Sequence, residues 1–317
     1  MSEGSQARCV GALIRDGRNR VYVHRRSADR RLLPGTWDIV GGHVEPGETP
    51  RQALAREIEE ETGWRLRRVE ARIADWEWVV HDGIPRRELD YLVEVDGDLS
   101  KPELEAGKHD AFAWVGPGDL DLMMQGRTDG DARLRDMVAK AVRIRLTERL
   151  RLEPAGPEHA GDLWFLHYDE GVATWQGGRW TAQTAQRRAA EMGEAWESRG
   201  VCKWIAYRRC DGALAGRGGL SFAEVDGRER LELGWTLASR MWGRGYATEI
   251  GRAGLDFAFT ELGAGHVVAF AKPHNRRSLN VIHKLGMRYT CDILFRGEPF
   301  ALYELARPAA GGTAPPP

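Results

Sequence analysis

The amino-acid sequence predicts an α/β (α+β) protein of two domains. Its 317 residues exceed the roughly 150 of an ordinary domain. In the first half, strand-like segments precede and follow one strongly acidic helix. In the second half, a glycine-containing turn joins a predicted strand to a predicted helix. The pattern changes near residues 145–151. We therefore expect domains at residues 1–146 and 147–307, followed by a disordered Pro-, Gly- and Ala-rich tail at 308–317.

The first half contains five strand-like segments. CVGALI and VYVHRR flank the turn signal DGRN, which predicts a β-hairpin over residues 9–26. Alternating or apolar runs predict three further strands, at residues 72–80, 88–95 and 112–115. A second helix is expected from about Asp131 to Arg143. Together these segments predict a mixed sheet that is interrupted by the acidic helix.

The acidic helix has clear boundaries. Thr49 can cap its amino end, Pro50 suits the first turn, and Gln52 stands where a capping-box partner belongs. Gly63 supplies the stop. The helix has one apolar stripe to bury, made by Ala53, Leu54 and Ile58. Its other faces remain available for polar chemistry.

Three glutamates crowd the carboxyl end of this helix. Glu57, Glu60 and Glu61 share one face because they stand three and four residues apart. Each like-charge pair costs about 0.2 to 0.5 kcal/mol, and carboxylates in the last turn also oppose the helix dipole. A cation would reverse this balance, and Mg²⁺ takes oxygen ligands that it shares with phosphates. The alternative is a solvated face that Arg56 partly neutralises.

The order of residues around the glutamates favours a metal site. Gly42, five residues, Glu48, seven residues and then REIEEETGW resemble the Nudix box, with nine specified residues over 23 positions. The resemblance implies an α/β/α sandwich and hydrolysis of a diphosphate linkage with Mg²⁺ or Mn²⁺. It implies that the catalytic metal ligands are Glu57, Glu60 and Glu61, with the Gly41 carbonyl as a further one. It implies structural roles for Gly42, Glu48, Arg56 and Gly63.

The substrate of this half must be inferred from other segments. Residues 25–42 are similar to the approach to the box in nucleotide-triphosphate Nudix hydrolases, and partly match the coenzyme A pyrophosphatase signature. His24 and the pair Ile39-Val40 depart from that signature, so we favour a nucleoside diphosphate linked to another group. Phosphates could be held by the arginines at 25, 26, 86 and 87, which are otherwise exposed charges. A base could stack on Trp37, Trp76 or Trp78, which are otherwise core residues.

The general base of the first half stays open. In the Nudix family a glutamate often stands about six residues before the tryptophan of a late strand, but counting back from Trp114 reaches Lys108. The role could pass to one of several neighbours, namely Glu103, Glu105, His109 or Asp110.

The second half begins with a strand, a turn and a helix in RLRLEPAGPEHAGDLW. Strands are then expected at LELGWTL, HVVAFA and FALYEL, and helices at residues 248–260 and 278–285. Between the first of these strands and its helix lies SRMWGRGYA. There Arg240, Gly243, Gly245 and Ala247 allow backbone N–H groups to converge on a pyrophosphate, because glycines leave room for close approach. A purely structural turn is the alternative.

The context favours phosphate binding. R-x-x-G-x-G followed by NRRSLNVIHKLGM resembles the GCN5-related N-acetyltransferase (GNAT) superfamily over residues 149–306, most closely its ribosomal-protein-alanine acetyltransferase branch. A GNAT mixed α/β domain and acetyl transfer from acetyl-CoA to a primary amine are implied. The implied cofactor-binding positions are Arg240, Met241, Trp242, Gly243, Arg244, Gly245, Tyr246 and Ala247, with Asn275, Ser278, Leu237 and Thr236.

The base of this second half is Glu232 in our prediction, with a structural role as the alternative. Many members of the superfamily carry a tyrosine acid in the late helix, where this chain has Ile282. His283 and Tyr303 are possible substitutes.

Composition narrows the classes of molecule that the protein is expected to bind. A net charge of -1 and a pI near 6.8 give no basic footprint for a nucleic-acid polymer, and no apolar run is long enough for a membrane span. The first residues lack a signal-peptide core, so a cytoplasmic location is expected. The scattered cysteines should be reduced thiols. Partners are a nucleotide and a primary amine, either a small molecule or a protein N-terminus; the oligomeric state is open.

The leading hypothesis is thus a bifunctional enzyme that is both a Nudix pyrophosphohydrolase and an N-acetyltransferase. One alternative makes the Nudix half a nucleotide sensor that regulates the acetyltransferase. Another keeps the hydrolase and makes the second half a non-catalytic CoA-binding domain, because the tyrosine is missing.

Overall fold

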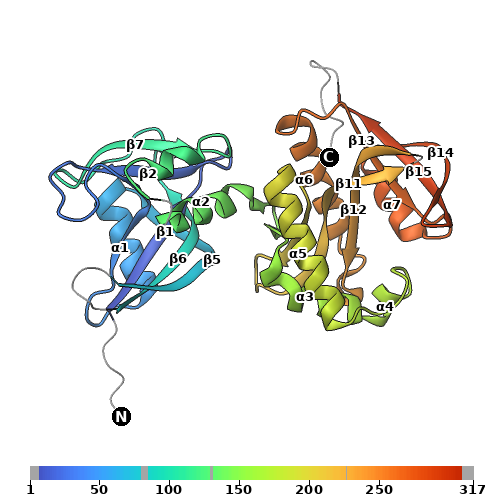
Figure 1. Ribbon diagram of the computed structural model, residues 1–317, viewed down its shortest axis with the longest axis horizontal. Coiled ribbons are helices and arrows are strands. Elements are labelled where there is room, and N and C mark those ends of the chain that lie inside the picture. Colours follow the sequence, from blue (N-terminus) through green and yellow to red (C-terminus); the bar gives the residue numbers. More distant parts are fainter. Residues whose placement is uncertain (1–6, 80–84, 129–130, 226, 309–317) are drawn as a thin grey trace, which may run out of the picture. The chain divides into compact units, whose positions relative to one another are not determined.

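The computed structural model describes residues 7–79, 85–128, 131–225 and 227–308, and the chain divides into two compact units between Ile144 and Arg145 (Figure 1). Apart from Pro308, the predicted tail lies outside the described residues, as does Val80 of a predicted strand. All four cysteines are free thiols. Within the described ranges, no helix is long and apolar enough to cross a membrane.

The first unit is built on two sheets. The larger has the strand order β4-β1-β6-β5, with β1 and β6 parallel and the other neighbours antiparallel. Its strands are β1 (Ala7–Ile14), β4 (Val40–His43), β5 (Arg65–Val79) and β6 (Pro85–Asp96). The smaller is antiparallel, with the order β3-β2-β7. Its strands are β2 (Val21–Arg26), β3 (Trp37–Asp38) and β7 (His109–Val115).

The predicted hairpin is wrong. Strands β1 and β2 belong to different sheets and share only the isolated bridge between Arg15 and Val21. The turn itself forms, since Asp16 Oδ1 accepts from the backbone N–H groups of Arg18 and Arg20, both at 2.9 Å. The ladder does not form because both edges of β1 are taken, one by β4 and the other by β6.

Helix α1 (Pro50–Thr62) has the predicted boundaries. Thr49 and Gln52 form a reciprocal capping box, and Gly63 ends the helix with a left-handed φ of 72°. The helix packs against β1, β4 and β5. Its apolar stripe joins a core with buried side chains of both sheets, such as Val10 and Tyr22. Helix α2 (Arg133–Arg143), after the short turn η1 (Leu120–Met124), packs against β5 and β2.

The second unit has an eight-stranded sheet in the order β14-β15-β13-β12-β11-β10-β9-β8, antiparallel except at the parallel pair β12 and β13. Its strands are β8 (Arg145–Leu146), β9 (Leu150–Pro154), β10 (Lys203–Arg208), β11 (Leu214–Val225), β12 (Arg228–Leu237), β13 (His266–Ala271), β14 (Arg288–Phe295) and β15 (Glu298–Ala306). Residues 266–271 form the strand that the sequence predicts. Strands β10, β11 and β14 were not predicted.

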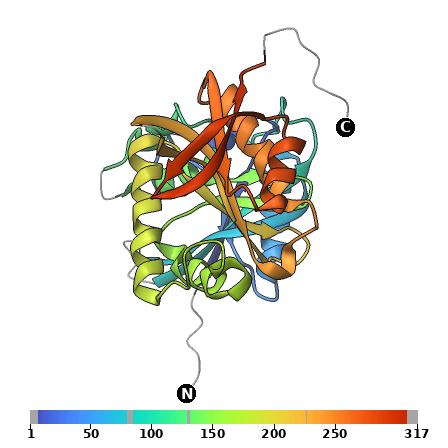
Figure 2. The same cartoon turned by 90° about the vertical axis from the view of Figure 1, so that its right-hand side faces the viewer.

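Helices cover this sheet and enclose an aromatic core that includes Trp196, Trp204 and Phe257. Figure 2 shows α5 in yellow beside the strands of the unit. The helical segments are η3 (Pro157–His159), α3 (Ala160–Tyr168), α4 (Glu170–Ala173), α5 (Ala182–Arg199), η4 (Ser239–Met241), α6 (Tyr246–Thr260) and α7 (Arg276–Lys284). The helices predicted at 248–260 and 278–285 are confirmed with slightly shifted ends, whereas α5 was not predicted.

Candidate active sites

The acidic helix presents three carboxylates to a cavity of the first unit. Glu57 and Glu61 are buried, at 7% and 6% exposure. The Glu60 side chain is 46% exposed. All three line a cavity of about 330 Å³, together with Gly41 and Gly42. Spacing along one helix thus brings the predicted metal ligands into one space.

The two glycines let the strand β4 pass close to these carboxylates. The Gly41 N–H donates to Glu61 Oε2 at 3.0 Å. A Cβ at Gly42 would lie 2.1 Å from Glu57 Oε1, and one at Gly41 would lie 2.4 Å from the Val10 carbonyl oxygen. Neither position therefore has room for a side chain.

Arg56 is the counter-ion of the acidic helix. Its Nε and Nη2 donate to the two Glu48 oxygens at 3.0 and 3.1 Å, and Nη2 also donates to the His43 carbonyl at 2.9 Å. Its Nη1 donates to Glu57 Oε1 at 2.7 Å and to Glu60 Oε2 at 3.4 Å. This fork ties the loop after β4 to the helix and orients two of the glutamates.

The buried carboxylates suit a divalent cation. Burial raises the pKa of Glu61 to about 8, and the charge of Glu57 adds to the rise while the Gly41 N–H opposes it. A buried carboxyl that lacks sufficient positive charge retains its proton, whereas an adjacent cation favours the ionised form. Carboxylate and carbonyl oxygens are the donors that Mg²⁺ prefers. Glu57, Glu60, Glu61 and the Gly41 carbonyl therefore provide chemistry that fits this ion.

Two histidines stand behind Glu61. His24 Nε2 lies 3.9 Å from Glu61 Oε2, and His109 Nε2 lies 3.8 Å from Glu61 Oε1. Burial lowers the pKa of His24 well below its usual range and that of His109 to about 4. One potential metal-ligand atom from each of His24, Glu61 and His109 lies within 4.8 Å of the other two. However, the rings stack at 3.6 Å and 16°, so their in-plane lone pairs run side by side and do not converge on one ion. The pair packs behind Glu61 as two neutral rings.

Basic side chains line the same cavity. Arg26, Arg30 and Lys108 join the glutamates around it. Arg26 is held by the Leu32 carbonyl, to which its Nε donates at 2.9 Å, and by Asp38 at 3.3 Å. Carboxylates and cations in one cavity suit a phosphate group that is bound partly through a metal ion and partly through guanidinium groups.

The other candidate phosphate ligands are engaged elsewhere. Arg25 pairs with Asp110 at 2.7 Å, and Arg87 pairs with Asp75 at 2.7 Å. Arg86 lies over the Trp78 ring, 5.5 Å from its centroid. Of the four arginines that the sequence offered, Arg26 alone is among the residues lining the cavity.

The remaining base and stacking candidates are also engaged. The Glu103 side chain packs against Gly63, behind the end of α1, and Glu105 pairs with Lys108 at 2.7 Å. Trp37 is buried and donates to Gln125 at 3.2 Å, while Trp76 donates to Asp90 at 2.7 Å. Of the base candidates, His109 comes within 4 Å of Glu61.

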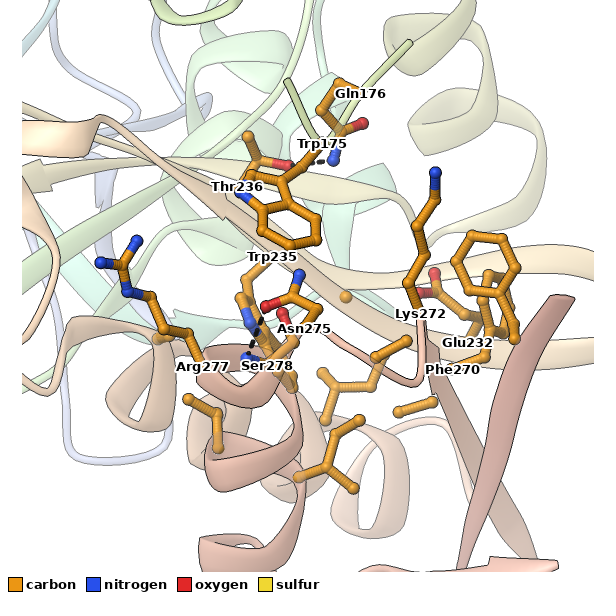
Figure 3. Close-up of a pocket in the computed structure, with 18 of the residues that line it drawn as sticks. Trp175, Gln176, Glu232, Trp235, Thr236, Phe270, Lys272, Asn275, Arg277 and Ser278 are labelled. Atoms are coloured by element: carbon orange, nitrogen blue, oxygen red, sulfur yellow. Dashed lines mark hydrogen bonds between the residues drawn. The ribbon is translucent and has the colours of Figure 1, made fainter. Parts of the chain in front are cut away.

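The second unit has a cavity of about 1430 Å³ where two strands part. In the described residues, β12 and β13 pair at Glu232 and Val268 alone. Figure 3 shows Trp175 and Gln176, which follow α4, on one side of this cavity and Asn275 and Ser278 of the α7 region on the other. The cavity is thus formed by the parted strands and closed by residues from distant segments.

The glycine turn borders this cavity. Gly243 and Gly245 adopt left-handed φ angles of 75° and 83°, and Gly245 is the N-cap of α6. Trp242 Nε1 donates to the Leu237 carbonyl at 2.8 Å, which closes the turn. A helix amino end with backbone N–H groups suits a phosphate. The predicted cofactor residues lining the cavity are Thr236, Leu237, Met241, Trp242, Gly243, Gly245, Ala247, Asn275 and Ser278.

Three residues of the turn do not line the cavity. Arg240 donates to the Leu214 carbonyl at 3.4 Å, the Arg244 carbonyl accepts from Arg149 at 2.9 Å, and Tyr246 is buried in the core.

Glu232 lines the cavity but is already paired. Its Oε2 accepts from Lys203 Nζ at 2.5 Å and from Ser221 Oγ at 3.2 Å. Lys203 is buried, which lowers its pKa, and it also donates to the Gly219 carbonyl at 2.8 Å.

The two substitute acids lie outside this cavity. Neither His283 nor Tyr303 is among the described residues that line it, and their rings contact each other edge to face at 5.6 Å. Ile282 does line the cavity, at the position where many members of the superfamily carry a tyrosine.

Comparisons with known proteins identify both units. A NUDIX domain model matches residues 5–140, and an acetyltransferase (GNAT) domain model matches residues 149–288. The uncharacterized protein YkkB of Bacillus subtilis is 32% identical over 165 residues, which cover 50% of this chain and 93% of that protein. The nucleoside triphosphatase NudI of Escherichia coli K12 is 37% identical over 102 residues, covering 29% of this chain and 70% of that protein. The chain belongs to the Nudix and GNAT families.

Solved structures with similar folds come from both families. A GnaT-family acetyltransferase from Bordetella pertussis has a TM-score of 0.47 at 25% identity, covering 51% of this chain and 99% of that chain. A MutT NUDIX hydrolase from Burkholderia pseudomallei has a TM-score of 0.35 at 26% identity, covering 42% of this chain and 97% of that chain. With a Nudix unit and a GNAT unit, the protein is an enzyme of the hydrolase and acyltransferase classes.

Several residues that reach these sites lie outside both family motifs. His24 approaches the Nudix glutamates, and Lys203, Trp175 and Gln176 reach the GNAT cavity. A lysine within the apolar run CKWIAY is the one sequence signal that points to a buried partner, because lysine is almost never buried unless paired.

Proposed function

We propose that the Nudix unit hydrolyses a nucleoside diphosphate linked to another group, with Mg²⁺ or Mn²⁺. The observation that carries this proposal is the cavity where Glu57, Glu60 and Glu61 meet Arg26 and other basic side chains. Those glutamates and the Gly41 carbonyl would hold the cation. When bound, the cation polarises phosphoryl oxygens and supplies hydroxide near neutral pH.

The chain's own residues bind and orient the substrate. Arg26 and Arg30 bind phosphate oxygens, and Arg56 keeps the acidic helix in register with its loop. His24 and His109 fill the space behind Glu61 and so hold its carboxylate in place. The name of the relative NudI favours phosphate as the group linked to the diphosphate, which would make the substrate a nucleoside triphosphate.

For the GNAT unit we propose acetyl transfer from acetyl-CoA to a primary amine. The amide groups at the start of α6 bind the pyrophosphate, and the gap between β12 and β13 receives the pantetheine arm. The amine nitrogen attacks the thioester carbonyl, which forms the C–N bond and breaks the C–S bond. The amine loses one proton, and the CoA thiolate takes up one. Glu232 is the proposed proton acceptor, and its Oε2 already accepts a hydrogen bond from Lys203.

Because both activities reside in one chain, each serves as a control for variants that affect the other. Glu60→Gln and Glu61→Gln should abolish magnesium-dependent phosphate release from a panel of nucleotides, while thiol release from acetyl-CoA with an amine panel continues. Glu232→Gln should lower acetyl transfer and shift its pH profile, while hydrolysis is unchanged.

Negative results would favour the alternatives. If the wild-type protein binds nucleotides without hydrolysing any of them, the Nudix unit is a sensor. If it binds acetyl-CoA but acetylates no amine, the GNAT unit is a binding domain.

A further inference from the structure

Arg217 of β11 is a cation in the GNAT cavity that forms no ion pair with any described residue. It is one of the residues that line the cavity, and it is only partly accessible. No carboxylate of the described residues lies within ion-pair distance of it. Burial lowers the pKa of the Arg217 guanidinium, and the charge of Glu232 opposes this shift from beyond ion-pair distance. The group nevertheless stays charged, because an arginine does not lose its proton in proteins. A charge in such a place needs a counter-charge.

The guanidinium is held from one side. Its Nε donates to His167 Nε2 at 3.1 Å. Burial, with the charge of Arg217 adding to it, lowers the pKa of His167 to about 3, so the imidazole is neutral and can accept this bond. The His167 ring stacks on Trp180 at 3.5 Å and 4°. A rigid pair of rings therefore orients the guanidinium.

The opposite edge of the guanidinium is available. Its two terminal nitrogens donate to no described residue. Neither nitrogen is completely shielded from solvent. These two nitrogens form the edge that binds a carboxylate through two parallel hydrogen bonds. Because the Nε side is fixed, that edge is pre-oriented for a planar anion.

Two other cations that line the cavity are already paired. Lys203 is paired with Glu232 at 2.5 Å, and Lys272 is paired with Glu298. Neither carboxylate of these pairs is within 4 Å of Arg217.

Arg217 lies on β11, whereas the glycine turn follows the neighbouring strand β12. In the sheet register it lies opposite Thr236, whose hydroxyl accepts from Gln176 on the cavity wall at 3.3 Å (Figure 3). The glycine turn that suits the pyrophosphate begins after Leu237, on the next segment.

We propose that Arg217 binds a carboxylate of the acetyl acceptor, so that the acetylated amine is one that also carries a carboxylate, such as a free amino acid. This inference rests on the proposed acetyltransferase function. The carboxylate binds the terminal guanidinium edge and is unchanged by the reaction, while the amine of the same molecule becomes the amide. Arg217 is thus a specificity-determining residue.

The test compares matched amines on the full-length protein. Thiol release from acetyl-CoA is measured with amino acids, with their carboxamides, and with amines that carry a phosphate. The wild-type protein should prefer the carboxylates in kcat/KM, by about 10- to 100-fold over the carboxamides. Arg217→Gln should lose this preference mainly through KM, and Arg217→Lys should recover part of it. Arg187→Gln, at an exposed position on α5, is the control.

Several results would overturn the proposal. Equal use of carboxamides by the wild-type protein would do so without any variant, and so would a preference for the phosphate-bearing amines. Weaker acetyl-CoA binding by a folded Arg217→Gln protein, measured by calorimetry, would assign the residue to the cofactor instead. If no amine is acetylated, the proposed function fails. Calorimetric binding of the same amino acids and carboxamides to the CoA-loaded protein then still decides the role of Arg217.

Discussion

Gly42 lies against the Glu57 carboxylate in the Nudix cavity, so adding one methyl group at Gly42 would test the placement of Glu57. A Cβ at this position would lie 2.1 Å from Glu57 Oε1 and 2.6 Å from Oε2. Non-bonded heavy atoms are at their best separation at about 3.5 Å or more, so the carboxylate would have to move by more than about 1 Å. It cannot move freely, because Arg56 Nη1 holds Oε1 at 2.7 Å.

The size of the effect follows from this geometry. Overpacking of this kind costs about 1 to 3 kcal/mol of stability, which a folded unit can withstand. A displacement of about 1 Å in a positioned group can cost about 100-fold in rate. Gly42→Ala should therefore remain folded, lose about 100-fold in hydrolysis and need more magnesium to reach half its maximal rate.

The assay is phosphate release over a magnesium titration, with thermal unfolding followed by circular dichroism. Gly17→Ala is the matched control, because a Cβ there would meet nothing within 4 Å. Acetyl transfer by the same protein gives a second control. If folded Gly42→Ala hydrolyses nucleotides at the wild-type rate and with the wild-type magnesium dependence, Glu57 is not a metal ligand.

Three further predictions concern stability and cofactor binding. Burial raises the pKa of both Asp90 and Glu88, so the folded state keeps protons there that the unfolded chain releases above a pH of about 4. The unfolding free energy of the Nudix unit should therefore fall as the pH rises from about 4 through neutrality. Asp90→Asn should flatten that slope in urea unfolding, and an unchanged slope would contradict the assignment. A Cβ at Gly219 would lie 2.4 Å from the Trp204 ring, so Gly219→Ala should destabilise the GNAT unit by about 1 to 3 kcal/mol. The unfolding midpoint of this unit should fall while hydrolysis persists. An unshifted midpoint would show that the ring can move aside. Asn275→Ala removes the cap of α7 and should cost about 1 kcal/mol and weaken acetyl-CoA binding by calorimetry, with unchanged binding as the refuting result.

Short sequence motifs predicted the segments whose boundaries depend on only a few neighbouring residues. Helix α1 begins and ends where Thr49, Pro50 and Gly63 indicate, because capping and a left-handed stop are chemical properties of those residues. Their spacing also places the three glutamates on one face. Likewise, residues 266–271 form the expected strand, since their apolar run is bounded by loops.

Features that depend on tertiary structure could not be predicted. The turn at DGRN formed without its hairpin, because β4 and β6 compete for the edges of β1 and lie far along the chain. His24 and His109 stack at 3.6 Å although 85 residues separate them. That Arg217 forms no ion pair with a described residue could be recognised only once its neighbours were known. The helix α5 buries Ala185, Ala189 and Trp196, a stripe of mostly small residues that carries little hydrophobic signal.

Arg56 has a consequence for the protein when divalent ions are scarce. Its guanidinium bonds to Glu48, Glu57 and Glu60 through the chain itself, so much of the acidic helix carries its own neutralising charge before any ion arrives. We therefore expect the Nudix unit to fold without a metal ion. A chelator would silence hydrolysis yet leave an intact protein, whose GNAT unit could keep working. If hydrolysis depends on a metal ion as proposed, metal supply would control that activity of the chain and spare the other.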